Sequence, residues 1–281
     1  DRQDGVHSCG KSIFGKSDRQ ADQKEQSIMN DNESVWEYFG ENDPYFGVNT
    51  IAEMRSDNLD ENALGVFFKS GEDYVARIWD EIEGNFIPGF RPERALDFGC
   101  GVARITLPIA KRSKEAVGVD ISTGMLALAQ KNAAEFGIDN ATFIKGDDDL
   151  SKVPGKFDLV HSFVVFQHIN PKKGEHIFKR LVEMLEVGGI GVLHVEYANT
   201  VSTTAQKIRF WAYRDLPLVY KIRSLLMGKR KEPLIPMYLY DLNRLMLILQ
   251  THGCHKVQVR FSKHGVEGAV LIFKKEEADL Y

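Results

Sequence analysis

The chain has 281 residues, of which 43% are hydrophobic and 27% charged, with a formal net charge of −4. This balance is typical of a globular protein with room for one α/β domain and an insertion. The acidic total gives no global attraction to nucleic acid, which counts against an RNA or DNA partner. No apolar run of 18 residues and no apolar leader occurs, so we expect a cytoplasmic protein without a transmembrane helix. Cys9, Cys100 and Cys254 show neither paired nor metal-ligand spacing, which favours a reducing compartment and predicts no metal site.

Composition divides the chain into five segments. The first is polar and has too few apolar groups to form a core, so it predicts a disordered tail or a cloning remnant. An aromatic segment, an α/β core, a basic insertion and a final helix with two strands follow. We place the tail at 1–32, a helical lid segment at 33–89, the core at 90–199, a helical cap insertion at 200–238 and the completing elements at 239–281.

The lid segment combines helical periodicity with a dense aromatic group. Apolar residues recur at spacings of three and four from Leu64 to Ile82, which predicts an amphipathic helix with Ser70 as its N-cap. Tyr45 and Phe46 allow two interpretations. They form either an aromatic lid over a ligand or part of a helix packed on the edge of the sheet.

Short apolar runs in the core predict strands of a parallel sheet that is covered on both faces. We expect strands at 94–98, 115–120, 142–145, 157–163 and 191–196, and helices at 103–111, 124–136 and 173–185. A last helix at 239–251 precedes strands at 256–262 and 269–274, which form a hairpin. The predicted fold is α/β: a Rossmann-like, doubly wound, mainly parallel seven-stranded sheet with an antiparallel C-terminal hairpin and an inserted helical cap.

A glycine turn follows the first strand of the core, in the run Asp97-Phe-Gly-Cys-Gly. Gly99 and Gly101 have no Cβ, so the backbone can approach a ligand closely. We expect the next helix to begin near Ala103 and to direct its free N–H groups toward the same space. Arg104 occupies the place of the third glycine of a dinucleotide fingerprint, which counts against a nicotinamide cofactor. Asp97 suits a cationic group, and Cys100 is expected to be a small buried side chain.

Carboxylates also follow the second and third strands. Asp120 closes the second strand and can accept hydrogen bonds from both hydroxyls of a ribose. Asp147 and Asp148 follow the third strand, where an acid can accept from an exocyclic amine and a backbone N–H can meet a ring nitrogen. The fourth strand leads into a loop that starts at Phe163, beside the expected reaction centre.

These motifs, in this order and at this spacing, resemble the class I S-adenosylmethionine-dependent methyltransferases. The glycine motif of that family matches 97–103, except that Ala103 replaces its third glycine. The resemblance implies S-adenosylmethionine as cofactor, with Asp120 on the ribose, Asp147 or Asp148 on the adenine, and Ile121 and Met125 packed against the adenine. The complete predicted cofactor set is Asp97, Gly99, Cys100, Gly101, Asp120, Ile121, Met125, Gly146, Asp147, Asp148 and Phe163.

Three residues near the strand ends are candidates for catalysis. His168 follows the fourth strand, where a general base can reach a hydroxyl acceptor, although a histidine there equally often caps a helix. Glu196 and Tyr197 follow the fifth strand and either bind the acceptor or make structural hydrogen bonds. His161 and His194 are expected to be scaffold.

The acceptor is expected to be the O or N of a small molecule or biosynthetic intermediate. No Asn-Pro-Pro-Tyr-type sequence follows the fourth strand, which disfavours methylation of nucleic acid. The stretch 207–231 has eight lysines and arginines against one acid, Asp215. It either meets an anionic, sugar-linked or lipid-linked acceptor or a membrane surface, or is a solvated basic face. The oligomeric state is left open.

Two alternatives belong to other functional classes. A catalytically silent module would keep the fold as a surface for binding a partner, and an eroded glycine turn or a missing ribose acid would favour it. A nucleotide-cofactor oxidoreductase would require preferential binding of a nicotinamide cofactor, which the missing third glycine disfavours.

Overall fold

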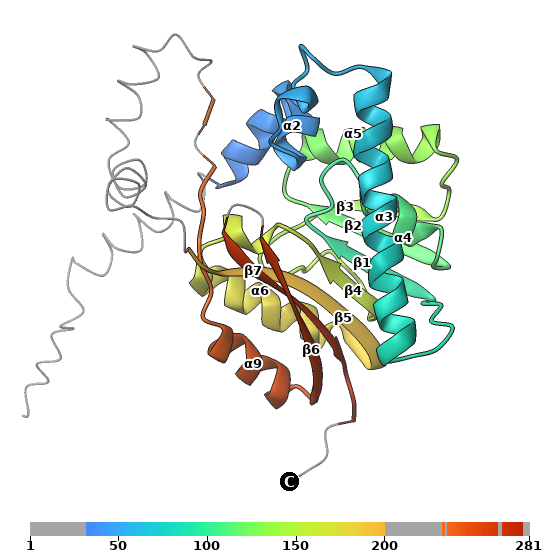
Figure 1. Ribbon diagram of the computed structural model, residues 1–281, viewed down its shortest axis with the longest axis vertical. Coiled ribbons are helices and arrows are strands. Elements are labelled where there is room, and N and C mark those ends of the chain that lie inside the picture. Colours follow the sequence, from blue (N-terminus) through green and yellow to red (C-terminus); the bar gives the residue numbers. More distant parts are fainter. Residues whose placement is uncertain (1–31, 200–231, 234, 264–265, 278–281) are drawn as a thin grey trace, which may run out of the picture.

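A seven-stranded sheet runs through the molecule in the order β3-β2-β1-β4-β5-β7-β6 (Figure 1). The computed structural model describes residues 32–199, 232–233, 235–263 and 266–277. Most of the predicted tail and the basic part of the predicted cap insertion, 1–31 and 200–231, therefore lie outside the described residues. The strands are β1 Arg94–Phe98, β2 Glu115–Asp120, β3 Ala141–Lys145, β4 Phe157–Ser162, β5 Leu185–Ala198, β6 Lys256–Lys263 and β7 Glu267–Lys274.

The sheet confirms the predicted doubly wound arrangement. Strands β1 to β5 pair in parallel, and β7 lies antiparallel between β5 and β6. The chain order of the strands reverses between β1 and β4, and in sheets of this kind ligands bind at such a point, beyond the carboxyl ends of the strands. β5 is longer than the predicted 191–196. Gly188 and Gly189 lie within β5, where they exchange backbone hydrogen bonds with Lys275, and β7 pairs with the strand from Ile190 to Ala198.

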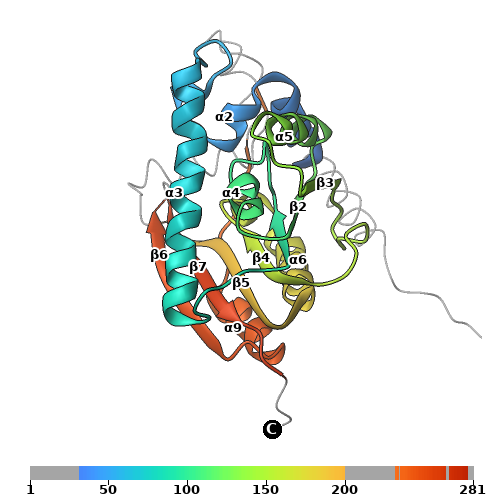
Figure 2. The same ribbon diagram turned by 90° about the vertical axis from the view of Figure 1, so that its right-hand side faces the viewer.

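Helices cover both faces of the sheet (Figures 1 and 2). The long helix α3 stands along one face, where its apolar side packs with α4 on residues of β1, β5 and β7. Helix α5 packs beside α4. On the opposite face, α6 and α9 cover a second apolar cluster. The helices are α2 Pro44–Val48, α3 Glu61–Asn85, α4 Thr106–Ala110, α5 Thr123–Glu135, α6 Pro171–Glu183 and α9 Leu242–Thr251, with 3-10 turns η1 Ala52–Met54 and η2 Phe166–His168; residues 32–42 are also helical.

Two predicted helix starts are wrong. α3 begins three turns earlier than the Ser70 cap implies, because the Asp60 carboxylate accepts the Ala63 N–H, whereas the Ser70 hydroxyl donates to Phe67 inside the helix. α4 begins at Thr106 rather than near Ala103, because Ala103 has a φ of 70° and extends the glycine turn. The free N–H groups of a helix start, which were expected near Ala103, are therefore not found at that position.

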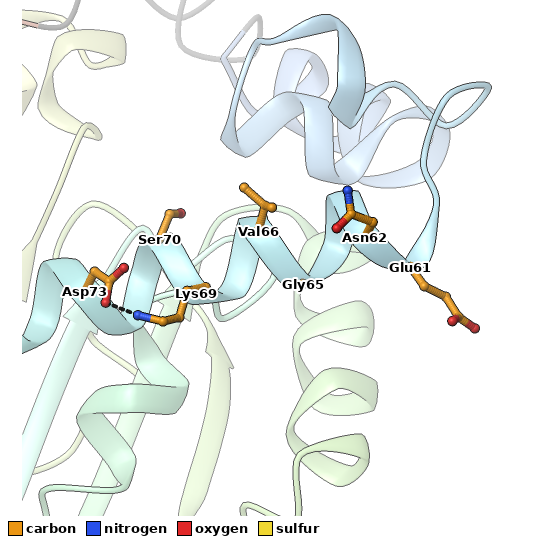
Figure 3. Close-up of a pocket in the computed structure, with 7 residues that line it drawn as sticks. All are labelled: Glu61, Asn62, Gly65, Val66, Lys69, Ser70 and Asp73. Carbon is orange, nitrogen blue, oxygen red and sulfur yellow. Dashed lines mark hydrogen bonds and ion pairs between the residues drawn. The ribbon is translucent and has the colours of Figure 1, made fainter.

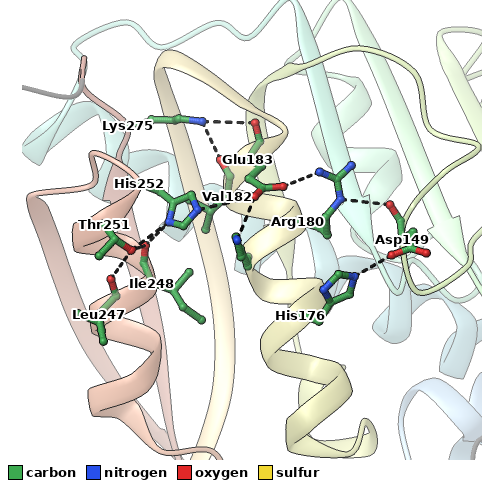
Figure 4. A network of polar contacts seen from close by, with 11 residues as sticks. Asp149, His176, Arg180, Val182, Glu183, Leu247, Ile248, Thr251, His252 and Lys275 are labelled. Carbon is green, nitrogen blue, oxygen red and sulfur yellow. Dashed lines mark hydrogen bonds and ion pairs between the residues drawn. The ribbon is translucent and has the colours of Figure 1, made fainter. Parts of the chain in front are cut away.

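Polar contacts fasten α6 to its neighbours (Figure 4). The Lys275 ammonium donates to the carbonyls of Val182 at 3.0 Å and Leu185 at 2.9 Å, where α6 passes into β5. His176, near the start of α6, is bonded to the Asp149 carboxylate at 2.8 Å. These contacts join α6 to the residue that follows β7 and to the loop that follows β3.

Candidate functional site

A cavity of about 760 Å³ opens beyond the carboxyl ends of β1, β2 and β4, where the strand order reverses. The structure brings together at this cavity every residue of the predicted cofactor set, from Asp97 to Phe163, and also His168. Glu196 and Tyr197 do not line it. The volume is in the range of ligand pockets, so the place predicted from the sequence is a cavity, while the roles of its residues stay predictions.

Two glycines shape the turn beneath this cavity. Gly99 has a φ of 75°, and a Cβ there would lie 2.3 Å from the Val165 side chain. Gly101 has a φ of 52°, and its N–H donates to the Asp120 carboxylate at 2.9 Å. Both conformations favour glycine. Between them, burial raises the pKa of the Cys100 thiol well above its usual range, which fits a packing residue rather than a nucleophile.

Asp120 ties the second strand to the glycine turn. One carboxylate oxygen accepts the Gly101 N–H and the other accepts the Ser122 N–H, each at 2.9 Å. Burial raises the pKa of this carboxyl, and the backbone donors partly oppose the rise. The two bonds orient the carboxylate at the cavity wall, and each oxygen keeps a lone pair for a hydroxyl.

The carboxylate of Asp97 is less available to a ligand than the sequence suggests, because both of its oxygens already have hydrogen-bond partners. Its two oxygens are bonded to the Thr106 hydroxyl at 2.6 Å and to His161 Nδ1 at 2.8 Å, and it is only 3% exposed. His161 Nε2 is in turn 3.1 Å from the Tyr74 hydroxyl on α3. The chain of bonds joins α3 to β1 and confirms His161 as scaffold. A cationic ligand near Asp97 would act on its charge rather than on a free oxygen.

The three aspartates of the turn after β3, Asp147, Asp148 and Asp149, lie in different environments. Asp147 accepts bonds from the Ser151 N–H and hydroxyl, which lower the pKa of Asp147. Asp148 forms an ion pair of 2.5 Å with Lys173, which also lines the cavity. Asp149 is exposed on the outside. Asp147 and Asp148 both line the cavity, so the structure leaves the adenine contact with either, as predicted.

His168 lines the cavity with both ring nitrogens already occupied. Nδ1 lies 2.8 Å from the Pro236 carbonyl, so it carries the proton, and Nε2 accepts from the Gln167 amide at 3.0 Å. Burial lowers the pKa of His168 to about 4, so the ring is neutral at pH 7. A general base needs a free lone pair. The base predicted at His168 therefore requires the Gln167 amide to move away first.

Glu196 and Tyr197 lie away from the cavity, on opposite faces of β5. Glu196 is fully buried beside His194, 3.7 Å away, and neither carboxylate oxygen has a hydrogen-bond partner. Tyr197 contacts Phe261 on β6, with ring centroids 6.1 Å apart. The prediction placed both at the ligand edge because they follow the fifth strand, but β5 continues to Ala198 and keeps them in the sheet.

The buried carboxyl of Glu196 predicts a pH-dependent stability. Burial and the charge of Glu267 raise its pKa to about 7. Unfolding lets this group ionise at its ordinary pKa, so its presence should lower the free energy of unfolding as pH rises from about 4.5 to about 7. We expect Glu196→Gln to match the wild type at pH 4.5 and to be about 3 kcal/mol more stable at pH 8. Urea unfolding at both pH values measures this, with the exposed Glu186→Gln as control; equal differences at the two pH values would contradict it.

Several residues of the cavity wall were missed by sequence reasoning, among them Trp36, Arg104 and Gln167. Trp36, on the helical stretch 32–42, lines the cavity and meets the His168 ring edge-on at 5.1 Å. Its neighbour Glu37 accepts the Thr123 N–H at 2.7 Å and so fastens that stretch to the start of α5. Arg104 and Gln167 also line the cavity. The sequence around Trp36 is rich in aromatic residues but does not predict a place at the cavity, because only the tertiary fold brings residues 32–42 over the strand ends.

A second hollow along the outer side of α3 is different in kind (Figure 3). Its lining comes from one helix, between Glu61 and Asp73, and includes the exposed Val66. Side chains from different helices and strands do not meet there, as they do in the main cavity. Within the described ranges, no three or more His, Cys, Asp or Glu side chains are placed to hold a metal ion. No helix in the same part of the chain has the length and apolar character to span a membrane.

Comparisons with known proteins agree with this geometry. Residues 95–189 match a family described as a methyltransferase domain. The chain is similar to the 23S rRNA (uracil(1939)-C(5))-methyltransferase RlmD of Aeromonas salmonicida, at 44% identity over 57 residues, 20% of this chain and 13% of that protein. The same enzyme of Shewanella sp. strain ANA-3 is 33% identical over 131 residues, 42% of this chain and 29% of that protein. The chain thus spans less than a third of the length of these relatives.

Solved structures show the same fold over most of the chain. The magnesium protoporphyrin IX methyltransferase of Synechocystis PCC 6803, with bound SAH, has a TM-score of 0.57 at 19% identity, covering 88% of this chain and 100% of that one. The N-methyltransferase NodS of Bradyrhizobium japonicum WM9, in complex with S-adenosyl-l-homocysteine, has a TM-score of 0.56 at 13% identity, with the same two coverages. At such identities the likeness concerns the fold.

One sequence prediction is corrected by these findings. The acidic net charge and the absence of an Asn-Pro-Pro-Tyr-type sequence were expected to make nucleic acid an unlikely partner, but the curated relatives quoted above are methyltransferases of ribosomal RNA. Net charge sums over the whole surface, whereas a partner responds to the local field around the site. The argument from total charge was therefore wrong.

Proposed function

Because this chain belongs to the class I S-adenosylmethionine-dependent methyltransferases, we propose that it transfers a methyl group from S-adenosylmethionine to an oxygen or nitrogen atom of its acceptor. One observation carries the proposal: the glycine turn, the strand-end carboxylates and the loop after β4 all line a single cavity. A silent module that had lost its ligand would not be expected to keep Gly99 and Asp120 in this arrangement.

The residues present fit the cofactor. Gly99 and Gly101 remove the side chains that would fill the floor of the cavity. Asp120 holds an oriented carboxylate for the ribose hydroxyls, and Asp147 or Asp148 accepts from the adenine amine. Ile121 and Met125 supply apolar wall for the adenine ring. When bound, S-adenosylmethionine supplies an electrophilic methyl group on a sulfonium.

The protein contributes position and exclusion of water. In-line displacement requires the acceptor atom to lie opposite the departing sulfur, and holding two reactants in that geometry is a large part of such catalysis. Phe163, Val164 and Val165 form the wall that follows β4, and Trp36 and His168 also line the cavity. Val164 has a φ of 60°, a strained value for a branched residue, so this wall is held in one particular shape.

Oxygen and nitrogen acceptors fit the described residues better than carbon does. They carry their own lone pairs, whereas an unactivated ring carbon needs help, for instance from a thiolate nucleophile. Burial raises the pKa of Cys254 to about 12 and that of Cys100 well above its usual range. Neither described cysteine is therefore suited to covalent catalysis. A neutral amine would need only positioning, which suits a site whose histidine is already hydrogen-bonded.

The acceptor class follows from two sources that point in different directions. The sequence analysis favours a biosynthetic intermediate, and the names of the curated relatives favour RNA. Since the shared segment is a small part of those relatives, RNA joins the acceptors to be tested. A cytoplasmic reaction is part of the proposal, because Cys100 and Cys254 are free thiols.

Calorimetry on the purified chain tests the proposed function. We expect S-adenosylmethionine and S-adenosylhomocysteine to bind with a Kd of about 1–10 μM, within the range of ordinary small-ligand affinities, and NAD not to bind. Labelled methyl transfer to total RNA, and to pools of small amines and alcohols, then identifies the acceptor. Binding of NAD alone would support the oxidoreductase, and binding of none would support the silent module.

A substitution at His168 separates catalysis from cofactor binding. We expect His168→Ala to lower turnover about 10-fold or more, because the ring packs on Trp36 and holds Gln167 beside the acceptor space. The Kd of S-adenosylhomocysteine should stay within twofold. Turnover and calorimetry measure the two effects, and the exposed His255→Ala is the control. Unchanged turnover would make His168 a structural residue only.

A further inference from the structure

Gln167 lies on the cavity wall and has one side-chain oxygen without a hydrogen-bond partner. The residue belongs to the 3-10 turn η2, lines the cavity and is 6% exposed. Its Oε1 is buried, and no group among the described residues donates to it. A buried acceptor without a donor costs free energy and calls for an explanation. The bond from Gln167 to His168 does not supply one, because it uses only the amide nitrogen.

The orientation of this amide follows from its neighbours. The Pro236 carbonyl can only accept, so His168 Nδ1, which lies 2.8 Å away, donates to it. Since burial lowers the pKa of His168 to about 4, the ring is neutral and its Nε2 carries a lone pair. The Gln167 amide lies 3.0 Å from that nitrogen and therefore presents its NH₂ group there. The opposite orientation would bring two acceptors together, so Oε1 is the atom left without a partner.

The backbone holds Gln167 close to the glycine turn. The Tyr238 N–H donates to the Gln167 carbonyl at 2.7 Å. Two residues before Gln167, Val165 packs so closely on Gly99 that a Cβ on the glycine would lie 2.3 Å from the valine side chain. A second cavity residue, Asn32, also has a buried side-chain oxygen, Oδ1, for which the described residues provide no donor. Two unpaired acceptors at one cavity favour a ligand that brings its own donor groups.

We propose that Gln167 determines the specificity of methyl transfer for a nitrogen acceptor, with its Oε1 accepting an N–H of a neutral primary or secondary amine. This inference rests on the proposed function and narrows it. The donated N–H orients the nitrogen and leaves its lone pair free. That lone pair forms the new N–C bond, while the electron pair of the broken S–C bond passes to the sulfur of S-adenosylhomocysteine. The product is an ammonium, which loses its proton to water after release.

An alcohol fits this arrangement less well than an amine does. Attack by a hydroxyl oxygen is assisted by removal of its proton, and an amide oxygen is too weak a base to remove it. The lone pair of His168 Nε2 is already used by the Gln167 amide. A tertiary amine has a lone pair but no N–H to donate, so methyl transfer should stop once the nitrogen carries no hydrogen.

A series of acceptors that differ in their N–H groups tests this role. The probes are benzylamine, 2-phenylethylamine and hexylamine, their N-methyl and N,N-dimethyl derivatives, the corresponding alcohols, and total RNA. We expect the wild type to methylate the primary and secondary amines at least about 10-fold faster than the tertiary amines and alcohols. In Gln167→Met, kcat/KM for the primary amines should fall about 10-fold, the order expected for one hydrogen bond, and that for the tertiary amines should not change. The exposed Gln130→Met on α5 is the matched control.

Binding supplies a readout that does not depend on turnover. With S-adenosylhomocysteine saturating, Gln167→Met should raise the Kd of benzylamine about 10-fold. The Kd of its N,N,N-trimethyl derivative, which has no N–H, should stay within twofold, as should the Kd of S-adenosylhomocysteine itself. Equal weakening of benzylamine and the trimethyl derivative would indicate a merely structural role and overturn the inference.

The position of the label decides the remaining outcomes. If RNA is the acceptor, digestion to nucleosides should place the methyl group on an amino nitrogen. Label on oxygen or carbon alone, or on no nitrogen of any probe although S-adenosylhomocysteine binds, would also overturn the inference. If the wild type binds neither S-adenosylmethionine nor S-adenosylhomocysteine, the proposed function has failed instead.

Discussion

Asp120→Ala should weaken the binding of S-adenosylmethionine about 100-fold. The carboxylate is expected to accept hydrogen bonds from two ribose hydroxyls, and each bond to a charged acceptor contributes more than a neutral one. It also holds the Gly101 N–H at 2.9 Å, so the turn itself loses an anchor. Calorimetry with S-adenosylmethionine measures the change in Kd.

Two further variants make this result interpretable. Asp120→Asn keeps the size and one acceptor oxygen, and should fall between alanine and the wild type. Asp139→Ala removes an exposed carboxylate outside the cavity and should have no effect. An unchanged Kd in a folded Asp120→Ala protein would mean that the ribose is held elsewhere.

Gly99→Ala should destabilise the protein by about 3–4 kcal/mol and abolish measurable cofactor binding. Two costs add. A residue with a Cβ at a φ of 75° costs about 1–2 kcal/mol. The Cβ would also lie 3.0 Å or less from three atoms of Val165, and overpacking of this kind costs about 1–3 kcal/mol. Urea unfolding measures the stability, and calorimetry measures the binding.

Gly89 provides the control that separates these costs. Its φ is 67°, and a Cβ there would meet nothing within 4 Å. Gly89→Ala should therefore show the backbone cost alone, about 1–2 kcal/mol, with normal cofactor binding. If the two variants lose equal stability, crowding against Val165 contributes nothing and Val165 moves aside.

Local signals were enough to predict most of the sheet. β1 and β2 begin and end at the predicted residues, because their apolar runs are bounded by charged residues on one side and by the glycine turn or Ser122 on the other. The N-cap of α3 was misplaced because Asp60 and Ser70 are both chemically able to cap, and only the fold decides between them. The short α4 depended on the positive φ of Ala103, which no propensity for alanine predicts.

The residues of the candidate site were likewise predicted only in part. Residues that follow buried strands, such as Asp120 and Asp147, were placed correctly because parallel strands end at one edge. Glu196 was misplaced because the length of β5 depends on pairing with β7, a partner more than 70 residues away in sequence. Hydrogen bonds made by Asp97 and His168 join distant segments, so the sequence identified the side chains but not how much of their bonding capacity is already used.

The walls of the cavity have different origins along the chain, which has an evolutionary consequence. The floor comes from within 95–189, the stretch that matches the methyltransferase domain. The opposite side includes Trp36 and 47–51 before that stretch, and Ile235 and Met237 after it. Mutations in these flanking pieces can alter the shape offered to an acceptor while the glycine turn stays intact. Selection for a new acceptor can therefore proceed without any trace in the segment by which relatives are recognised.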